Sequence, residues 1–177
     1  KFIRDHKEQP FFAMLTYTLP HAELNLPHDS IYKMYENSFE ETPYIGKFDK
    51  VYGGYNTSEK PLASFAAMVS RLDKYVGDVM AELKELGLDK NTIVIFTSDN
   101  GPWLTEHENG GSAGPLKDGK GTWWEGGFRV PAICWMPGKI KPAINDEIMT
   151  SMDLYPTFLS MAGIEQPKDL VLDGVNQ

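Results

Sequence analysis

Apolar positions along the chain fall into three short runs and one long periodic stretch. Each run is almost continuous in apolar residues, which is typical of strands buried on both faces of a sheet. The runs occupy residues 11–18, 92–97 and 130–136. Between the first two, apolar residues recur every three or four positions from Leu62 to Leu86, which predicts one long amphipathic helix. Buried strands and a helix together predict an α/β fold.

Signals for helix ends and for irregular chain mark the rest of the sequence. We expect Ser58 to cap the long helix and Gly87 to end it. A second helix is predicted over 153–162, capped by its first residue, Asp153, and stopped by Gly163. Residues 22–57 carry no sustained period, so we expect an extended excursion there. Because no repeat or linker is visible, the 177 residues are predicted to form a single domain.

Composition narrows the classes of function. The chain has 17 Lys and Arg against 25 Asp and Glu, which gives a formal net charge of −8. This charge argues against non-specific binding to nucleic acid or to an anionic membrane, although a small anionic substrate can still bind locally. The single cysteine, Cys134, excludes an internal disulfide and a cysteine-rich zinc site. No apolar run reaches the roughly 20 residues that span a bilayer, so no membrane span is expected.

Polar side chains that can carry chemistry follow two of the predicted strands. In open α/β sheets, ligands bind beyond the carboxyl ends of the strands. Asp99 and Asn100 follow the second run and offer hard oxygen ligands that suit Ca²⁺ or Mg²⁺; alternatively, Asp-Asn-Gly is ordinary turn chemistry. His21 follows the first run, where an imidazole can bind an anion or transfer a proton; alternatively, it is a polar surface residue.

A glycine-rich segment, 110–131, leads into the third run. Its glycines flank Lys120, so the backbone can approach a ligand closely while one ammonium group points into the site. The spacing is not that of a Walker phosphate-binding loop. An ordinary glycine-rich surface loop is the alternative interpretation.

The order of these segments is more specific than any one of them. They are Phe11-Phe12 through Pro20-His21, Thr92 through Asp99-Asn100-Gly101-Pro102, Gly119-Lys120-Gly121-Thr122, Glu125-Gly126-Gly127-Phe128-Arg129-Val130-Pro131, Asp153-Leu154-Tyr155-Pro156-Thr157 and Leu172-Asp173-Gly174. In this order they resemble the formylglycine-dependent sulfatases of the alkaline phosphatase superfamily. The similarity covers nearly the whole chain, apart from the variable excursion 22–57. It implies part of an alkaline-phosphatase-like α/β/α sandwich with a mostly parallel central sheet.

The resemblance assigns roles to individual residues. Asp99 and Asn100 match the family's second pair of ligands for a divalent cation, usually Ca²⁺, with Mg²⁺ as the alternative. Lys120 matches the lysine that contacts the sulfate ester, and His21 matches the histidine that faces the sulfate and the leaving oxygen. Both are expected to be catalytic and to bind substrate, because an ammonium group stabilises sulfuryl oxygens and an imidazole can protonate a leaving alkoxide. Trp103 and His107 are further expected substrate contacts.

Two motifs of the family do not occur in this chain. The nucleophile motif Cys/Ser-x-Pro-x-Arg and the preceding Asp-Asp pair of metal ligands are both absent, and Cys134 stands in a strand context. We therefore interpret residues 1–177 as one partial catalytic domain, the middle-to-late part, with the N-terminal strands and the formylglycine in a missing N-terminal part. The chain alone is expected to be inactive and to need that part as its partner.

The expected function is hydrolysis of a sulfate ester on a carbohydrate or an aryl alcohol by the intact protein. One alternative is a phosphatase or phosphodiesterase of the same superfamily; the small number of histidines, four, and the Gly-Lys-Gly-Thr segment count against it. Another is a non-catalytic carbohydrate-binding module whose Trp103, Trp123 and Trp124 stack on sugars. Family resemblance alone favours a periplasmic or extracellular location. The sequence leaves open which sulfated substrate is used.

Overall fold

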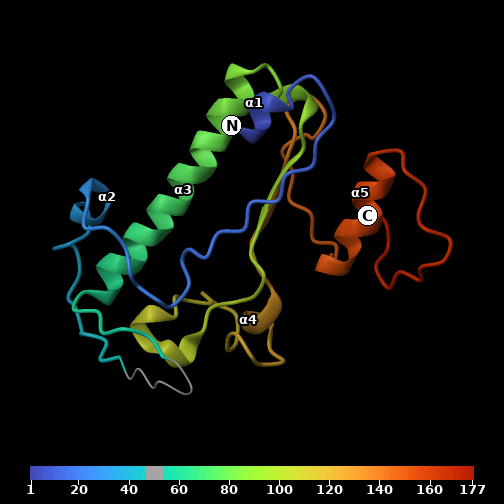
Figure 1. Cartoon of the computed structure of the whole chain (residues 1–177). Helices are drawn as coiled ribbons and strands as arrows, with labels where there is room; N and C mark the ends of the chain where they lie inside the picture. The colour runs from blue at the N-terminus through green and yellow to red at the C-terminus, as the bar shows by residue number, and fades with distance from the viewer. Residues whose placement is uncertain (47–53) are drawn as a thin grey trace. The chain divides into compact units, whose positions relative to one another are not determined.

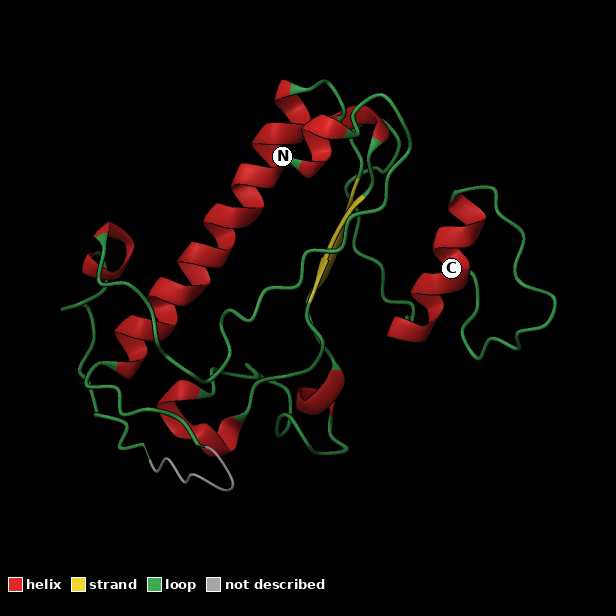
Figure 2. Ribbon diagram, in the orientation of Figure 1, coloured by secondary structure: helices red, strands yellow, loops and turns green. Residues whose placement is uncertain are grey.

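The computed structural model describes residues 1–46 and 54–177, and these form two compact units, 1–140 and 141–177. The elements of the first are α1 (Phe2–Asp5), α2 (Ser30–Lys33), α3 (Pro61–Glu85), η1 (Asp89–Asn91), β1 (Val94–Thr97), η2 (Leu104–Asn109), α4 (Glu125–Phe128) and β2 (Ala132–Trp135). The second contains η3 (Ser151–Asp153) and α5 (Leu154–Met161) (Figures 1 and 2). Among the described residues, no helix is long and apolar enough to cross a membrane.

The predicted long helix is confirmed as α3, and its end is where the sequence indicates it. The helix stops at Glu85, and Gly87 follows with a φ of 69°, the left-handed conformation that a glycine adopts without steric cost. The guanidinium group of Arg4 in α1 lies 2.6 Å from the Glu82 carboxylate and 3.0 Å from that of Glu85. These ion pairs hold the amino-terminal helix against the last turns of α3 (Figure 1).

The start of α3 corrects the predicted cap. Ser58 does not cap the helix, because its backbone pairs with Tyr44 in an isolated β-bridge. The free N–H groups of the first turn are satisfied by the Glu41 carboxylate, which accepts from Leu62 N at 3.0 Å and from Ala63 N at 2.9 Å. A carboxylate at a helix N-terminus is stabilising because it also faces the positive end of the helix dipole. Glu41, in the excursion 22–57, therefore caps the N-terminus of α3.

The described parts of the excursion, 22–46 and 54–57, contain a short helix and a β-bridge that the sequence does not predict; positions 47–53 lie outside the described residues. The short helix, α2, packs on the first half of α3. The buried cluster between them consists of Tyr32, Ala63 and Ala67, with Leu26, Ile31 and Tyr35 packed around it. Asp29 accepts from the N–H groups of Ile31 and Tyr32 and from Arg71 Nη2 at 2.8 Å. The hydrogen bond from Arg71 is the main reason why the pKa of Asp29 lies below its usual value.

Two of the three predicted strands form a ladder. β1 and β2 pair antiparallel, with Val94 opposite Trp135 and Thr97 opposite Ala132. Each is shorter than its predicted run, and Cys134 lies in β2 as expected. This ladder is the one sheet among the described residues, so the mostly parallel order of a larger sheet stays a prediction.

The first apolar run corrects a prediction. Residues 11–18 are not assigned to a strand, and Met14 and Leu15 are 75% and 54% exposed. An apolar segment becomes a buried strand only where neighbouring strands satisfy its backbone groups, and no described strand pairs with this one. The segment contacts α3 through Tyr17, whose ring stacks on that of Tyr75 at 5.7 Å between centroids.

The second unit is organised around one carboxylate. The predicted helix is present as η3 and α5, and Gly163 follows it with a φ of 67°. Its cap is Thr150 and not Asp153, because the two residues form a capping box in which Asp153 is the third helical position. Asp153 is buried and also accepts from Val175 N at 2.8 Å. Hydrogen bonds from the backbone N–H groups of Thr150 and Val175 lower the pKa of Asp153.

Candidate active site

The first component of the site is the loop that leaves β1. The strand ends at Thr97, so Asp99 and Asn100 stand directly beyond its carboxyl end, as the sequence predicts. Asp99 is exposed and Asn100 is half-buried. The Ser98 hydroxyl donates to the Asn100 carbonyl oxygen at 3.1 Å, which closes a tight turn under both side chains. The segment is therefore a turn that also presents two oxygen-bearing side chains, and their role as metal ligands stays a prediction.

The second component is the glycine-rich loop, which is bonded to the first through main-chain atoms. Lys120 N donates to Pro102 O at 2.8 Å, and Gly101 N donates to Gly127 O at 2.9 Å. The approach is so close that a Cβ atom at Gly101 would overlap the Gly126 carbonyl oxygen. The lysine loop and the Asp99-Asn100 loop thus form one backbone-linked assembly.

An aromatic side chain brings Lys120 and His21 together. The ammonium nitrogen of Lys120 lies 5.1 Å from the centroid of the Trp103 ring, within the range of a cation–π contact. The His21 ring lies 6.3 Å from the same ring. Tyr55 completes the group, 5.8 Å from His21 and 6.0 Å from Trp103 between centroids. Three of the sequence-predicted residues therefore meet, and Tyr55, from the variable excursion, joins them without having been predicted.

A buried amide fixes the turn that carries His21. Asn109, at the end of η2, is 1% exposed, and its Nδ2 donates to the Ala22 carbonyl oxygen at 3.1 Å. Because a carbonyl oxygen only accepts, the amide nitrogen must be the atom that faces it. The other atom of this amide, Oδ1, has no hydrogen-bond partner among the described residues. Nothing in the local sequence marks Asn109, because its partner lies 87 positions away.

The structure does not bring every predicted residue into this group. His107 lies in η2, is exposed, and makes no ring or cation–π contact with Trp103 in the described part of the chain. Its backbone adopts a φ of 50° and a ψ of −124°, an unusual conformation for a residue other than glycine. Trp123 is 93% exposed, and Trp124 lies beneath the Lys117 ammonium nitrogen, 3.4 Å from the ring centroid. The role of His107 as a substrate contact stays a prediction.

The donor set at Asp99 and Asn100 fits a divalent cation only in part. Carboxylate and amide oxygens are ligands that Ca²⁺ and Mg²⁺ prefer, but Ca²⁺ takes about six to eight oxygens. Within residues 1–46 and 54–177, no group of three or more His, Cys, Asp or Glu side chains is placed to hold a metal ion. Asp99 and Asn100 would therefore supply only two of the oxygen ligands of such a site, and their role as metal ligands stays a prediction.

Comparison with known proteins identifies the family. A family model described as "Sulfatase" matches residues 1–164. The chain belongs to the sulfatase family. The predicted relationship to sulfatases of the alkaline phosphatase superfamily is thereby confirmed. Membership implies a divalent cation and a formylglycine as general features, without indicating which cation.

Individual sulfatases agree with the family match. The chain is 46% identical over 110 residues to N-acetylgalactosamine-6-sulfatase of Mus musculus, covering 61% of this chain and 21% of that protein. It is 44% identical over 110 residues to human arylsulfatase A, covering 62% and 22%. The chain also matches the crystal structure of Ps i-CgsB in complex with k-i-k-neocarrahexaose, with a TM-score of 0.79 and 32% identity. The match covers 99% of this chain and 34% of the Ps i-CgsB chain. The predicted fold class is confirmed as a partial α/β piece of the sulfatase fold, and the chain spans about a fifth of the length of these curated relatives.

Proposed function

We propose that the intact protein carrying this chain is a sulfuric ester hydrolase that acts on a sulfated glycan. The observation that carries the proposal is the convergence of Lys120 and His21 on Trp103, next to the loop that holds Asp99 and Asn100. Family membership supports the reaction type. A cation, an acid and oxygen ligands for a metal are groups that assist transfer of a sulfuryl group to a nucleophile.

Each residue has a chemical task in this proposal. The Lys120 ammonium group binds the sulfate ester and stabilises negative charge on its oxygens during transfer. The His21 imidazole lies at the leaving oxygen and donates a proton to the departing alcohol. Asp99 and Asn100 supply two oxygen ligands to a divalent cation, for which we propose Ca²⁺. When bound, that cation adds positive charge at the sulfate oxygens. His107 and Trp103 are proposed to contact the substrate.

The proposal for the rest of the protein rests on the same resemblance. We place the formylglycine, the remaining metal ligands and the neighbouring strands in other parts of the intact protein, so the chain alone is proposed to be inactive and to be one part of a single catalytic domain. Exposed apolar side chains in residues 11–18 and at Ile133 of β2, which is 60% exposed, support a covering by further structure. A periplasmic or extracellular location is proposed from the family alone.

Support for a glycan comes from the relatives and from the site. One relative is named an N-acetylgalactosamine-6-sulfatase, and one related structure holds an oligosaccharide. The Trp103 and Tyr55 rings beside His21 offer apolar faces of the kind on which sugar rings stack.

The test is sulfate release from 4-nitrophenyl sulfate by the intact protein and its Lys120→Ala variant. We expect kcat to fall about a hundredfold or more, because one charge-stabilising group aimed at the transferring oxygens is lost. Lys117→Ala is the matched control, since Lys117 also lies in the glycine-rich loop over a tryptophan ring, and it should hydrolyse the ester like the wild type. Equal activity of the two variants would refute the role of Lys120.

A further inference from the structure

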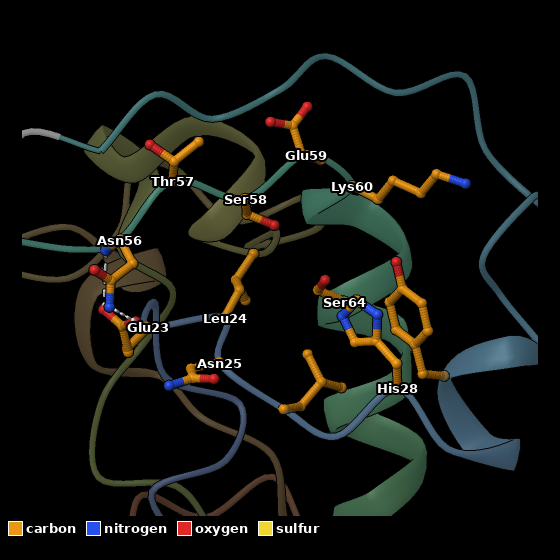
Figure 3. A pocket seen from close by; sticks show the side chains of 12 residues that line it. Glu23, Leu24, Asn25, His28, Asn56, Thr57, Ser58, Glu59, Lys60 and Ser64 are labelled. Carbon is orange, nitrogen blue, oxygen red and sulfur yellow. Dashed lines mark hydrogen bonds between the residues drawn. The ribbon is translucent and has the colours of Figure 1, made fainter.

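The excursion 22–57 and the start of α3 enclose a pocket next to the proposed active site. It has a volume of about 410 Å³, within the range of roughly 300–1,000 Å³ of small-molecule sites (Figure 3). Its lining comprises Glu23, Leu24, Asn25, Leu26, His28, Tyr32, Asn56, Thr57, Ser58, Glu59, Lys60 and Ser64. None of the residues assigned a task in sulfate-ester cleavage lines it.

This pocket shares part of its wall with the hollow at His21. That hollow has a volume of about 530 Å³ and is lined by Thr18, Leu19, His21, Glu23, Asn25 and Met68. Glu23 and Asn25 border both spaces. A ligand whose sulfate ester is held at His21 can therefore extend past these two residues into the pocket.

The side chains of the pocket are suited to hydroxyl groups. Figure 3 shows Glu23 and Asn56 on one side and His28 on the other. The Glu23 carboxylate accepts from Asn56 N at 3.2 Å and from Asn56 Nδ2 at 2.8 Å, which fixes that wall. The His28 ring is held by stacking on Tyr32, with 4.0 Å between centroids and an angle of 11°. Within the described residues, the side-chain amide of Asn25 makes no hydrogen bond and is available as both donor and acceptor.

The charges of the pocket disfavour a second sulfate group. Two carboxylates, Glu23 and Glu59, line it. The ammonium nitrogen of Lys60 is already bound to Glu36 O at 2.7 Å and to Asn37 Oδ1 at 3.1 Å. Because like charges brought together reduce affinity, an unsulfated unit fits better than a sulfated one.

We propose that this pocket binds the unsulfated sugar unit next to the sulfated unit of a glycan substrate, with Asn25 and His28 as its specificity-determining contacts. The inference rests on the proposed sulfatase function and deepens it by assigning a second binding site. A glycan then gains contacts at both spaces, whereas an aryl sulfate occupies only the hollow at His21.

The test compares three probes with the intact protein: 4-nitrophenyl sulfate, k-i-k-neocarrahexaose and a chondroitin 6-sulfate tetrasaccharide. We expect Asn25→Ala and His28→Ala to lower kcat/KM for the better oligosaccharide about tenfold, the loss that about 1.4 kcal/mol of contact energy produces. Hydrolysis of 4-nitrophenyl sulfate should stay at the wild-type rate in His28→Ala, because His28 lines only the pocket, whereas Asn25 also borders the hollow at His21. The controls are Asn91→Ala, an exposed asparagine of η1, and His6→Ala, which also removes a stacked histidine.

The outcomes separate this inference from the function beneath it. Oligosaccharide hydrolysis unchanged in both pocket variants, or a loss in His28→Ala that is equal on all probes, overturns the pocket assignment and leaves the sulfatase function intact. Hydrolysis of the aryl ester with none of either oligosaccharide also overturns it. Sulfate release from no probe by the wild-type protein instead overturns the proposed function.

Discussion

The hydrogen bond from Asn109 to the Ala22 carbonyl oxygen is the most direct test of how the site is assembled. It joins the end of η2 to the residue that follows His21, across 87 positions of sequence. Replacing Asn109 by Ala removes the donor and leaves the turn without this anchor. We therefore expect both the stability of the protein and the placement of His21 to suffer.

The magnitude follows from burial. Asn109 and Ala22 are 1% and 4% exposed, so water does not replace the lost donor freely. A buried acceptor left without a partner costs about 1–3 kcal/mol. The same substitution removes Oδ1, which has no partner in the described structure, and this offsets part of the cost. The free energy of unfolding should thus fall by about 1–2 kcal/mol. Asn109→Asp should cost more, because it places an oxygen acceptor against the Ala22 carbonyl oxygen.

The assay combines urea unfolding with steady-state kinetics on 4-nitrophenyl sulfate. Because His21 is proposed to protonate the leaving oxygen, we expect Asn109→Ala to lower kcat about tenfold to a hundredfold, while KM stays close to its wild-type value. Asn91→Ala is the control for loss of an exposed amide. The reasoning is refuted if Asn109→Ala unfolds at the same urea concentration as the control and keeps the wild-type kcat.

Two further predictions concern stability. Glu41→Ala should lower the free energy of unfolding by about 1–2 kcal/mol, because two N–H groups of α3 lose their acceptor. Glu40→Ala, at the exposed neighbouring position, is the control and should leave the free energy of unfolding unchanged. Equal urea midpoints for the two variants would contradict the capping role of Glu41. Since the N–H groups of Thr150 and Val175 lower the pKa of Asp153, its contribution to stability is complete above the usual value of 3.8 and is lost as pH falls through the lower folded pKa. Thermal unfolding from pH about 6 to about 2 should show a smaller acid-side decline for Asp153→Asn, and a decline equal to that of the wild type contradicts this.

The local sequence pattern was sufficient to predict an element where the interactions that form the element are themselves local. The period of the apolar residues and Gly87 were enough to predict α3, because both describe one helix and its own termination. Ser58 was a wrong prediction for the cap, since Glu41 reaches the first turn from 21 positions upstream. The run 11–18 has the composition of a buried strand, yet burial and pairing depend on neighbours that its own sequence does not describe. Tyr55 and Asn109 were not predicted for the same reason, because Tyr55 contacts His21 and Asn109 binds Ala22, and both contacts join residues that are distant in sequence.

Different kinds of contact hold the two halves of the site, the Asp99 and Lys120 loops on the one hand and the His21 segment on the other. This difference explains which half could be predicted from the sequence. The loops of Asp99 and Lys120 are joined by main-chain hydrogen bonds, and at Gly101 the backbones approach too closely for any side chain. Such packing demands glycine, so the motif appears directly in the residue pattern. His21 instead lies on a separate segment, whose Ala22 carbonyl oxygen accepts a hydrogen bond from the distant side chain of Asn109. Perturbing that amide should therefore affect His21, the proposed proton donor, while leaving Lys120 and the proposed metal ligands in place.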